Sequence, residues 1–150
     1  MIKISEKLLK NVLGPGVVVY LSNPGRLFSS DFHYHIILNT PTQDCDYLLV
    51  LVTSQITINK KIIEKSGWSP STLIEVSPAE CSFLKKPSAV NCNNVFAYSV
   101  KELKEMYDAG QINLAKGSTV SPAILSKLRK AVLKSEKVEK FFQIVIENEQ

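Results

Sequence analysis

The chain has 150 residues, of which 45% are hydrophobic and 21% charged, and its 18 basic and 14 acidic side chains give a formal net charge of +4. This composition is typical of one globular domain and excludes collagen-like and wholly disordered chains. No apolar run reaches the roughly 20 residues that span a bilayer, so we expect no membrane partner. The mild positive charge allows a polyanionic partner without requiring one.

The cysteines and the N-terminal residues predict a cytoplasmic location. The three cysteines are an odd number without CxxC spacing, as in proteins of a reducing compartment, and the two histidines are too few for a structural zinc site. The stretch that begins at Met1 has neither the apolar region nor the small-residue cleavage site of a secretory signal. We therefore expect one cytoplasmic domain over residues 1–150.

The first part of the chain predicts a short helix followed by three strands. Residues 5–13 carry apolar side chains at helical spacing behind Ser5, which can cap the helix. β-Branched or continuous apolar stretches predict strands over residues 17–21, 32–39 and 47–53. A polar turn separates the last two strands, which should pair antiparallel, whereas the turn-rich residues 22–31 predict an irregular loop.

The middle of the chain predicts three more short strands. They are expected over residues 72–76, 88–91 and 95–98. The polar pair Asn93 and Asn94 divides the last two of them. Residues 57–66 fit either a short surface helix or a loop, because their periodicity is weak.

The C-terminal third predicts helices. A capping box at Ser99 and Glu102 opens the first of them. Ser121, followed by a proline, caps a second helix that runs to about Leu133, and a last helical segment begins near Ser135.

One helix, five or six short strands and then helices is the element order of an α+β protein. Short strands with Pro/Gly turns predict a small, strongly bent antiparallel sheet or barrel over about residues 16–98, with a helical part over about 99–148. The C-terminal helices share an apolar face that fits either a homodimer contact or packing on the chain's own barrel. That face comprises Ile124, Leu128, Val132, Phe141 and Val145.

The two histidines are the first candidates for chemistry. His33 and His35 alternate along the expected strand and therefore point to the same face, while the Tyr34 ring points to the other face and is assigned to the core. Two neighbouring imidazoles can divide the general-acid and general-base roles near neutral pH. Alternatively, they are structural histidines at a sheet edge.

Hydroxyl and basic side chains supply further candidates. Thr53, Ser54 and Gln55 end the third strand, where they can line a pocket or bond to their own turn. Lys85 and Lys86 precede Ser88 and can hold a phosphate as point charges, or they are simply solvated. Arg26, beside a glycine in the first loop, is a candidate phosphate contact or an ordinary surface arginine.

Several common catalytic motifs are absent from the sequence. There is no GxxxxGK[ST], GxGxxG, GxSxG or HExxH, and no cluster of carboxylates suited to Mg²⁺. The sequence thus predicts no cofactor and no metal site, and any hydrolysis is expected to be metal-independent.

Four segments in order resemble the MazF/PemK (Kid) toxin superfamily, whose SH3-like barrel is shared with the gyrase poison CcdB. A glycine leads the first strand at residues 16–20, and the apolar strand at 35–39 is similar to the family's second strand. The stretch 52–55 has the family's hydroxyl-rich ending, and residues 77–92 look like the segment that closes the barrel in PemK-like proteins. The resemblance implies a PemK/CcdB-type antiparallel barrel with an N-terminal helix and C-terminal helices.

The resemblance also implies a toxin of a toxin–antitoxin system that cleaves single-stranded RNA without a metal. The family's catalytic threonine falls on Thr53, but its arginine falls on His33 and the following proline on Tyr34. Either the chemistry is rearranged around His33, His35 and a loop cation such as Arg26, or cleavage is lost.

The implied catalytic residues are therefore His33, His35 and Thr53. The implied substrate-binding residues are Arg26, Ser54, Gln55, Lys85, Lys86 and Ser88. A cognate antitoxin and a second copy of the chain are the implied partners. The alternative is a non-catalytic barrel of the same type that binds protein or RNA, and a third possibility is an accessory protein with no nucleic-acid role.

Overall fold

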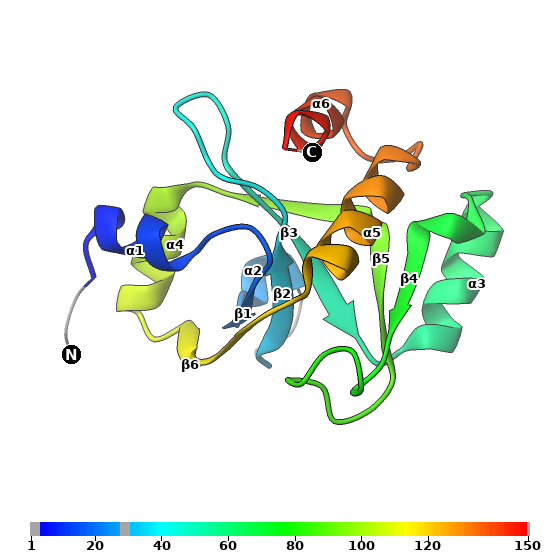
Figure 1. Ribbon diagram of the computed structural model, residues 1–150, viewed down its shortest axis with the longest axis horizontal. Coiled ribbons are helices and arrows are strands. Elements are labelled where there is room, and N and C mark those ends of the chain that lie inside the picture. Colours follow the sequence, from blue (N-terminus) through cyan, green and yellow to red (C-terminus); the bar gives the residue numbers. More distant parts are fainter. Residues whose placement is uncertain (1–3, 28–30, 150) are drawn as a thin grey trace.

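The computed structural model describes residues 4–27 and 31–149, with the backbone alone at 115–117 (Figure 1). Six strands form one antiparallel sheet in the order β4-β5-β3-β2-β1-β6. The elements are α1 Glu6–Val12, β1 Val17–Leu21, α2 Pro24–Leu27, β2 His33–Ile37, β3 Tyr47–Thr53, α3 Ile56–Ser66, the 3₁₀ helix η1 Pro70–Thr72, β4 Leu73–Val76, β5 Ser88–Tyr98, α4 Val100–Asp108, β6 Ile112–Thr119, α5 Pro122–Leu133 and α6 Lys140–Asn148.

Most of the predicted elements are confirmed, and so is the α+β class. The strands at 17–21 and 47–53 have the expected bounds, and β2 and β3 pair antiparallel. The helix caps also form as expected: Ser5 and Ser121 each accept a backbone N–H, and Ser99 and Glu102 form a complete capping box. These signals are local, which is why the sequence reveals them.

The sheet is open, so the strands do not close into the barrel that their pattern predicts. β4 and β6 are its two edges, and they lie at opposite ends of the strand order. The last strand, β6, pairs with β1 antiparallel, with a register shift between Val18 and Tyr20. Within the described residues, β6 and β4 are not hydrogen-bonded to each other, and no further strand connects them.

Five segments differ from the expectations or settle open alternatives. β5 is one continuous strand rather than two, and β6 was not predicted at all. The first loop contains the four-residue helix α2, and the weakly periodic residues 57–66 belong to the helix α3. The last helix, α6, begins at Lys140, five residues beyond the Ser135 turn.

The sheet separates two hydrophobic cores. One face packs on α5 and α6 through Ile36 and Leu38, and the other packs on α1 and α4 through Ile37. In Figure 1, α1 and α4 lie together on the left and α5 and α6 at the upper right. Since side chains alternate along β2, His33 and His35 belong to the α1/α4 face and Tyr34 to the α5/α6 face.

The apolar face of the C-terminal helices packs on the chain's own sheet. Ile124, Leu128 and Val132 are buried in the core below α5, and Val145 packs against it. Phe141 is the exception, because half of its surface is exposed. No helix in the described parts of the chain is long and apolar enough to cross a membrane.

Candidate functional site

One cavity of about 740 Å³ brings together most of the predicted site residues. It forms where β2 begins and β3 ends, beside the loop over residues 77–87. That loop lies at the bottom of Figure 1. Seven of the nine predicted residues line it: His33, Thr53, Ser54, Gln55, Lys85, Lys86 and Ser88. We call this space the strand-end cavity.

The antiparallel register explains why His33 and Thr53 line the same cavity. His35 pairs with Leu51, and Ile36 with Val50. Continuing that register by two residues brings His33 opposite Thr53 on the same face of the sheet. Both side chains are half-buried.

The Thr53 hydroxyl also takes part in the turn that leads to α3. Its oxygen accepts a hydrogen bond of 3.1 Å from the backbone N–H of Gln55. A hydroxyl can accept this bond and still donate its own hydrogen elsewhere. Thr53 therefore combines the turn-bonding role and the pocket-lining role that the sequence left as alternatives.

His35 lies outside the cavity, in the core. Its side chain is fully buried and meets the Phe96 ring edge-on, with the ring centroids 5.7 Å apart. Nδ1 lies 3.0 Å from the carbonyl oxygen of His33, whereas Nε2 has no hydrogen-bond partner among the described residues. Burial lowers the pKa of His35 to about 4, so the ring is neutral at neutral pH and cannot exchange a proton with a ligand in the cavity.

Arg26 is also outside the cavity and holds neighbouring elements together. Its Nη1 donates to the carbonyl oxygen of Ala97 at 2.6 Å, and its guanidinium carbon lies 4.3 Å from the centroid of the Tyr98 ring. Its Nη2 forms an ion pair with Glu102 at 3.3 Å. These contacts connect α2 to the end of β5 and the start of α4, so the Arg26 side chain has a structural role.

Four aromatic rings line the strand-end cavity, and the sequence pattern does not mark them as site residues. Phe32 stacks on Tyr20 at 5.2 Å, Tyr20 meets Tyr34 at 4.6 Å, and Tyr34 meets Phe83 at 4.9 Å between centroids. We call this row the aromatic ladder. Tyr20 and Tyr34 are adjacent because they are register partners on β1 and β2.

The ladder gives Tyr34, which the sequence assigns to the core, a second position at the cavity. Tyr34 does pack against the core below α5, but it remains half-buried and lines the cavity. The signal that could have found the ladder is the alternation of aromatic and histidine residues over 32–35. Its significance depends on the pairing with β1 and on the loop that carries Phe83, neither of which the sequence reveals.

Two lysines provide positive charge at the cavity. Lys85 and Lys86 are exposed, and the backbone of Lys86 is fixed by the Ser88 hydroxyl, which donates to its carbonyl oxygen at 3.1 Å. Neither ammonium takes part in an ion pair within the described residues. They are therefore available to an anionic ligand.

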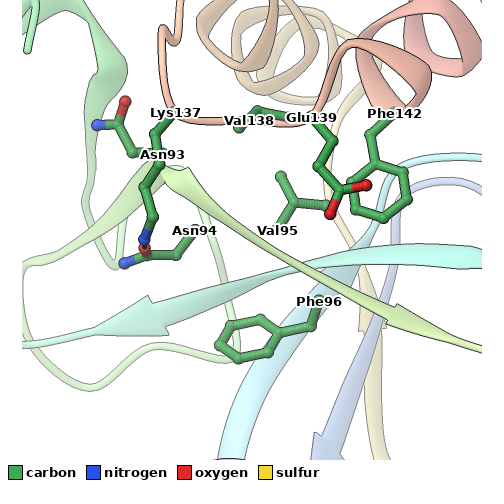
Figure 2. A pocket seen from close by; sticks show the side chains of 8 residues that line it. All are labelled: Asn93, Asn94, Val95, Phe96, Lys137, Val138, Glu139 and Phe142. Carbon is green, nitrogen blue, oxygen red and sulfur yellow. Dashed lines mark hydrogen bonds between the residues drawn. The ribbon is translucent and has the colours of Figure 1, made fainter.

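Two other cavities contain none of the predicted site residues. One of about 270 Å³ lies between β5 and the start of α6, where Figure 2 shows Lys137 reaching Asn94. The Lys137 ammonium donates to the Asn94 side chain at 2.6 Å and lies 5.4 Å from the Trp68 ring centroid. The other, of about 590 Å³, lies between α3 and β4, where Lys60 and Glu75 form an exposed ion pair.

The described side chains offer no group of three or more His, Cys, Asp or Glu residues that could hold a metal ion. The strand-end cavity instead combines one imidazole, hydroxyl groups, two ammonium groups and aromatic rings. Such a set can exchange a proton, stabilise a negative charge and stack against a flat ring. No protein-family model matches the chain, and no curated protein matches its sequence.

Proposed function

We propose that this protein is a metal-independent endoribonuclease that cleaves single-stranded RNA in the strand-end cavity. The main support is that His33, Thr53 and the pair Lys85 and Lys86 come from three separate segments and line the same space. An imidazole, a hydroxyl and ammonium groups can supply the base, the acid and the charge stabilisation that this chemistry needs without a metal.

The resemblance to MazF/PemK toxins agrees with this proposal. On that basis the open sheet is a variant of their SH3-like barrel, the RNase is the toxin of a toxin–antitoxin system, and a cognate antitoxin and a second copy are its protein partners. These relations are part of the proposal and depend on the resemblance alone.

The proposed reaction forms a bond from the ribose 2′-oxygen to phosphorus and breaks the bond from phosphorus to the 5′-oxygen. His33 takes the proton of the 2′-hydroxyl as general base. Thr53 and Lys85 donate hydrogen bonds to the phosphorane oxygens, where negative charge develops. Lys86 gives a proton to the departing 5′-oxygen, and the products are a 2′,3′-cyclic phosphate and a 5′-hydroxyl.

The second candidate function is RNA binding without cleavage. The burial of His35 favours it, because only one of the two imidazoles lines the cavity. The lysines and the aromatic ladder are sufficient for binding, since a positive groove with stacking rings is the general form of a single-strand site.

A cleavage assay in EDTA tests the proposal. The wild-type protein should cut labelled single-stranded RNA and leave a 2′,3′-cyclic phosphate end, which mass spectrometry identifies. His33→Gln and Thr53→Val should each lower the cleavage rate by about 100-fold or more, because they remove the proton acceptor and the hydroxyl donor. Lys127→Ala changes an exposed lysine on α5 that does not line the cavity, and it should cut at the wild-type rate.

The outcomes separate the two candidates. Binding of RNA without cleavage of any RNA pool would support the binding module. Equal cleavage by the wild type and both cavity variants would rule out the assignment of His33 and Thr53, and the absence of both binding and cleavage would overturn both candidates.

A further inference from the structure

The aromatic ladder has two ends, and both end rings line the cavity that His33, Lys85 and Lys86 also line. Among the described rings, Phe32 contacts only Tyr20, and Phe83 contacts only Tyr34. Each end ring therefore has a face that no other ring of the ladder covers. Phe32 directly precedes His33, and Phe83 lies two residues before Lys85.

We infer that Phe32 and Phe83 each stack on one unpaired base and thereby position the backbone between them at His33, Thr53 and the lysines. This inference rests on the proposed binding of single-stranded RNA. Tyr20 and Tyr34 fill the space between the two end rings and keep them apart in steps of 4.6–5.2 Å.

The arrangement fits bases better than other flat or apolar ligands because positive charge lies close to Phe83 in the chain. A nucleotide carries its phosphate next to its base, and Lys85 and Lys86 lie on the same loop as Phe83. An aromatic face with a neighbouring cation is the combination that single-strand sites use. A base within a duplex is stacked and paired already, so it would have to leave the helix to reach either ring.

The chemistry of the end rings also determines how selective the contact is. Phenylalanine has no hydrogen-bonding atom, so it stacks on every base and distinguishes none of them by its edge. The two end contacts are therefore sequence-tolerant. Any preference for a particular base has to come from the polar side chains of the cavity, such as Ser54 and Gln55.

A binding assay with uncleavable oligonucleotides tests this inference separately from cleavage. The probe is a short, fluorescein-labelled single-stranded 2′-O-methyl oligonucleotide, which has no free 2′-hydroxyl to react. Phe83→Leu and Phe32→Leu should each weaken its binding by about 5-fold to 150-fold, the usual effect of losing one base–aromatic stack. Phe83→Tyr keeps a ring and should retain most of the affinity.

Two controls separate stacking from loss of folding and from phosphate binding. Phe141→Leu alters an exposed phenylalanine on α6 that is outside the cavity, and it should bind like the wild type. An oligonucleotide with abasic positions retains its phosphates, so wild-type protein should bind it more weakly, and the Leu variants should bind it no worse than the wild type does. The matching duplex should also bind more weakly.

The results distinguish this inference from the proposed nuclease function. Base-dependent binding by a protein that cuts no RNA would uphold the inference and overturn the nuclease. Equal affinity of the wild type for the abasic and the complete oligonucleotide would overturn the inference, even if the protein cleaves RNA and needs His33 to do so. So would an unchanged affinity in both Leu variants.

Discussion

His35 is enclosed as a neutral base in the core, and its burial makes the stability of the protein depend on pH. The ordinary pKa of a histidine is 6.5, and burial lowers the pKa of His35 to about 4. Between these two values the unfolded chain binds more protons than the folded chain does. The free energy of unfolding therefore falls as the pH falls through this interval.

The variant His35→Leu should remove this part of the pH dependence. Between pH 7 and pH 5, the wild type should lose about 2 kcal/mol more of its free energy of unfolding than the variant does, as the two pKa values require. Urea denaturation at the two pH values measures the difference. An identical pH dependence in wild type and His35→Leu would contradict the assignment of this pH dependence to His35.

The same pair of histidines shows how far the sequence predicts single residues. Strand alternation correctly places His33 and His35 on one face, because it depends only on local backbone geometry. The burial of His35 depends on Phe96, which β5 contributes from much later in the chain. Arg26 likewise contacts Tyr98 and Glu102, which are distant in the sequence. The sequence of its own loop therefore does not reveal whether Arg26 is available to a ligand.

At the scale of elements, β5 is a strand with an asparagine-rich bulge. Val50 pairs with Val95 but Val52 with Val90, so β5 has extra residues in between. In that interval Asn93 is buried and donates to Thr72 and to Asn91 at 2.7 and 2.9 Å, while its oxygen accepts from Ser135 at 2.7 Å. The bulge thus ties β5 to η1 and to the turn before α6.

Asn93→Ala should lower the free energy of unfolding by about 2–4 kcal/mol, because it removes the acceptor of the buried Ser135 hydroxyl and the amide that donates to Thr72 and Asn91. Asn94→Ala is the matched control: Asn94 is half-buried and bonds to Lys137, so its loss should cost about 1 kcal/mol or less. Chemical denaturation measures both. Equal effects of the two substitutions would mean that the network does not stabilise the fold.

Two elements show why the sequence predicts strands unevenly. The Asn93–Asn94 pair predicts a break between two strands. The structure has a bulge there instead, and β5 continues through it. β6 has small and polar residues in its second half, so its composition does not indicate a strand. It forms because β1 offers an edge to pair with, which is a tertiary effect.

At the scale of the whole molecule, the two cores determine which surfaces are available to a partner. α5 contributes its apolar side chains to the core between this helix and the sheet, where Leu128 is fully buried. Of the two possibilities that the sequence left for this face, packing on the chain's own sheet is therefore the one observed. A homodimer, which the resemblance implies, has to use another surface.

Leu128→Ala should lower the free energy of unfolding by about 2–5 kcal/mol, the usual cost of a cavity in a core, without changing the oligomeric state. Denaturation and light scattering measure the two properties. Phe141→Ala removes a half-exposed ring from α6 and should have a smaller effect on stability. If Leu128→Ala converted a dimer into an equally stable monomer, the assignment of Leu128 to the core would be wrong.

The alternation of side chains along β2 restricts where related chains can gain or lose residues. Deleting one residue inside it would turn the side chains beyond that point to the opposite faces, so a tyrosine would enter the layer below α1 and α4 and an imidazole would face α5. The turn after β2 has no such restriction, since residues 42–44 are exposed. Insertions and deletions that evolution has accepted should therefore be found in that turn and be absent from the strand.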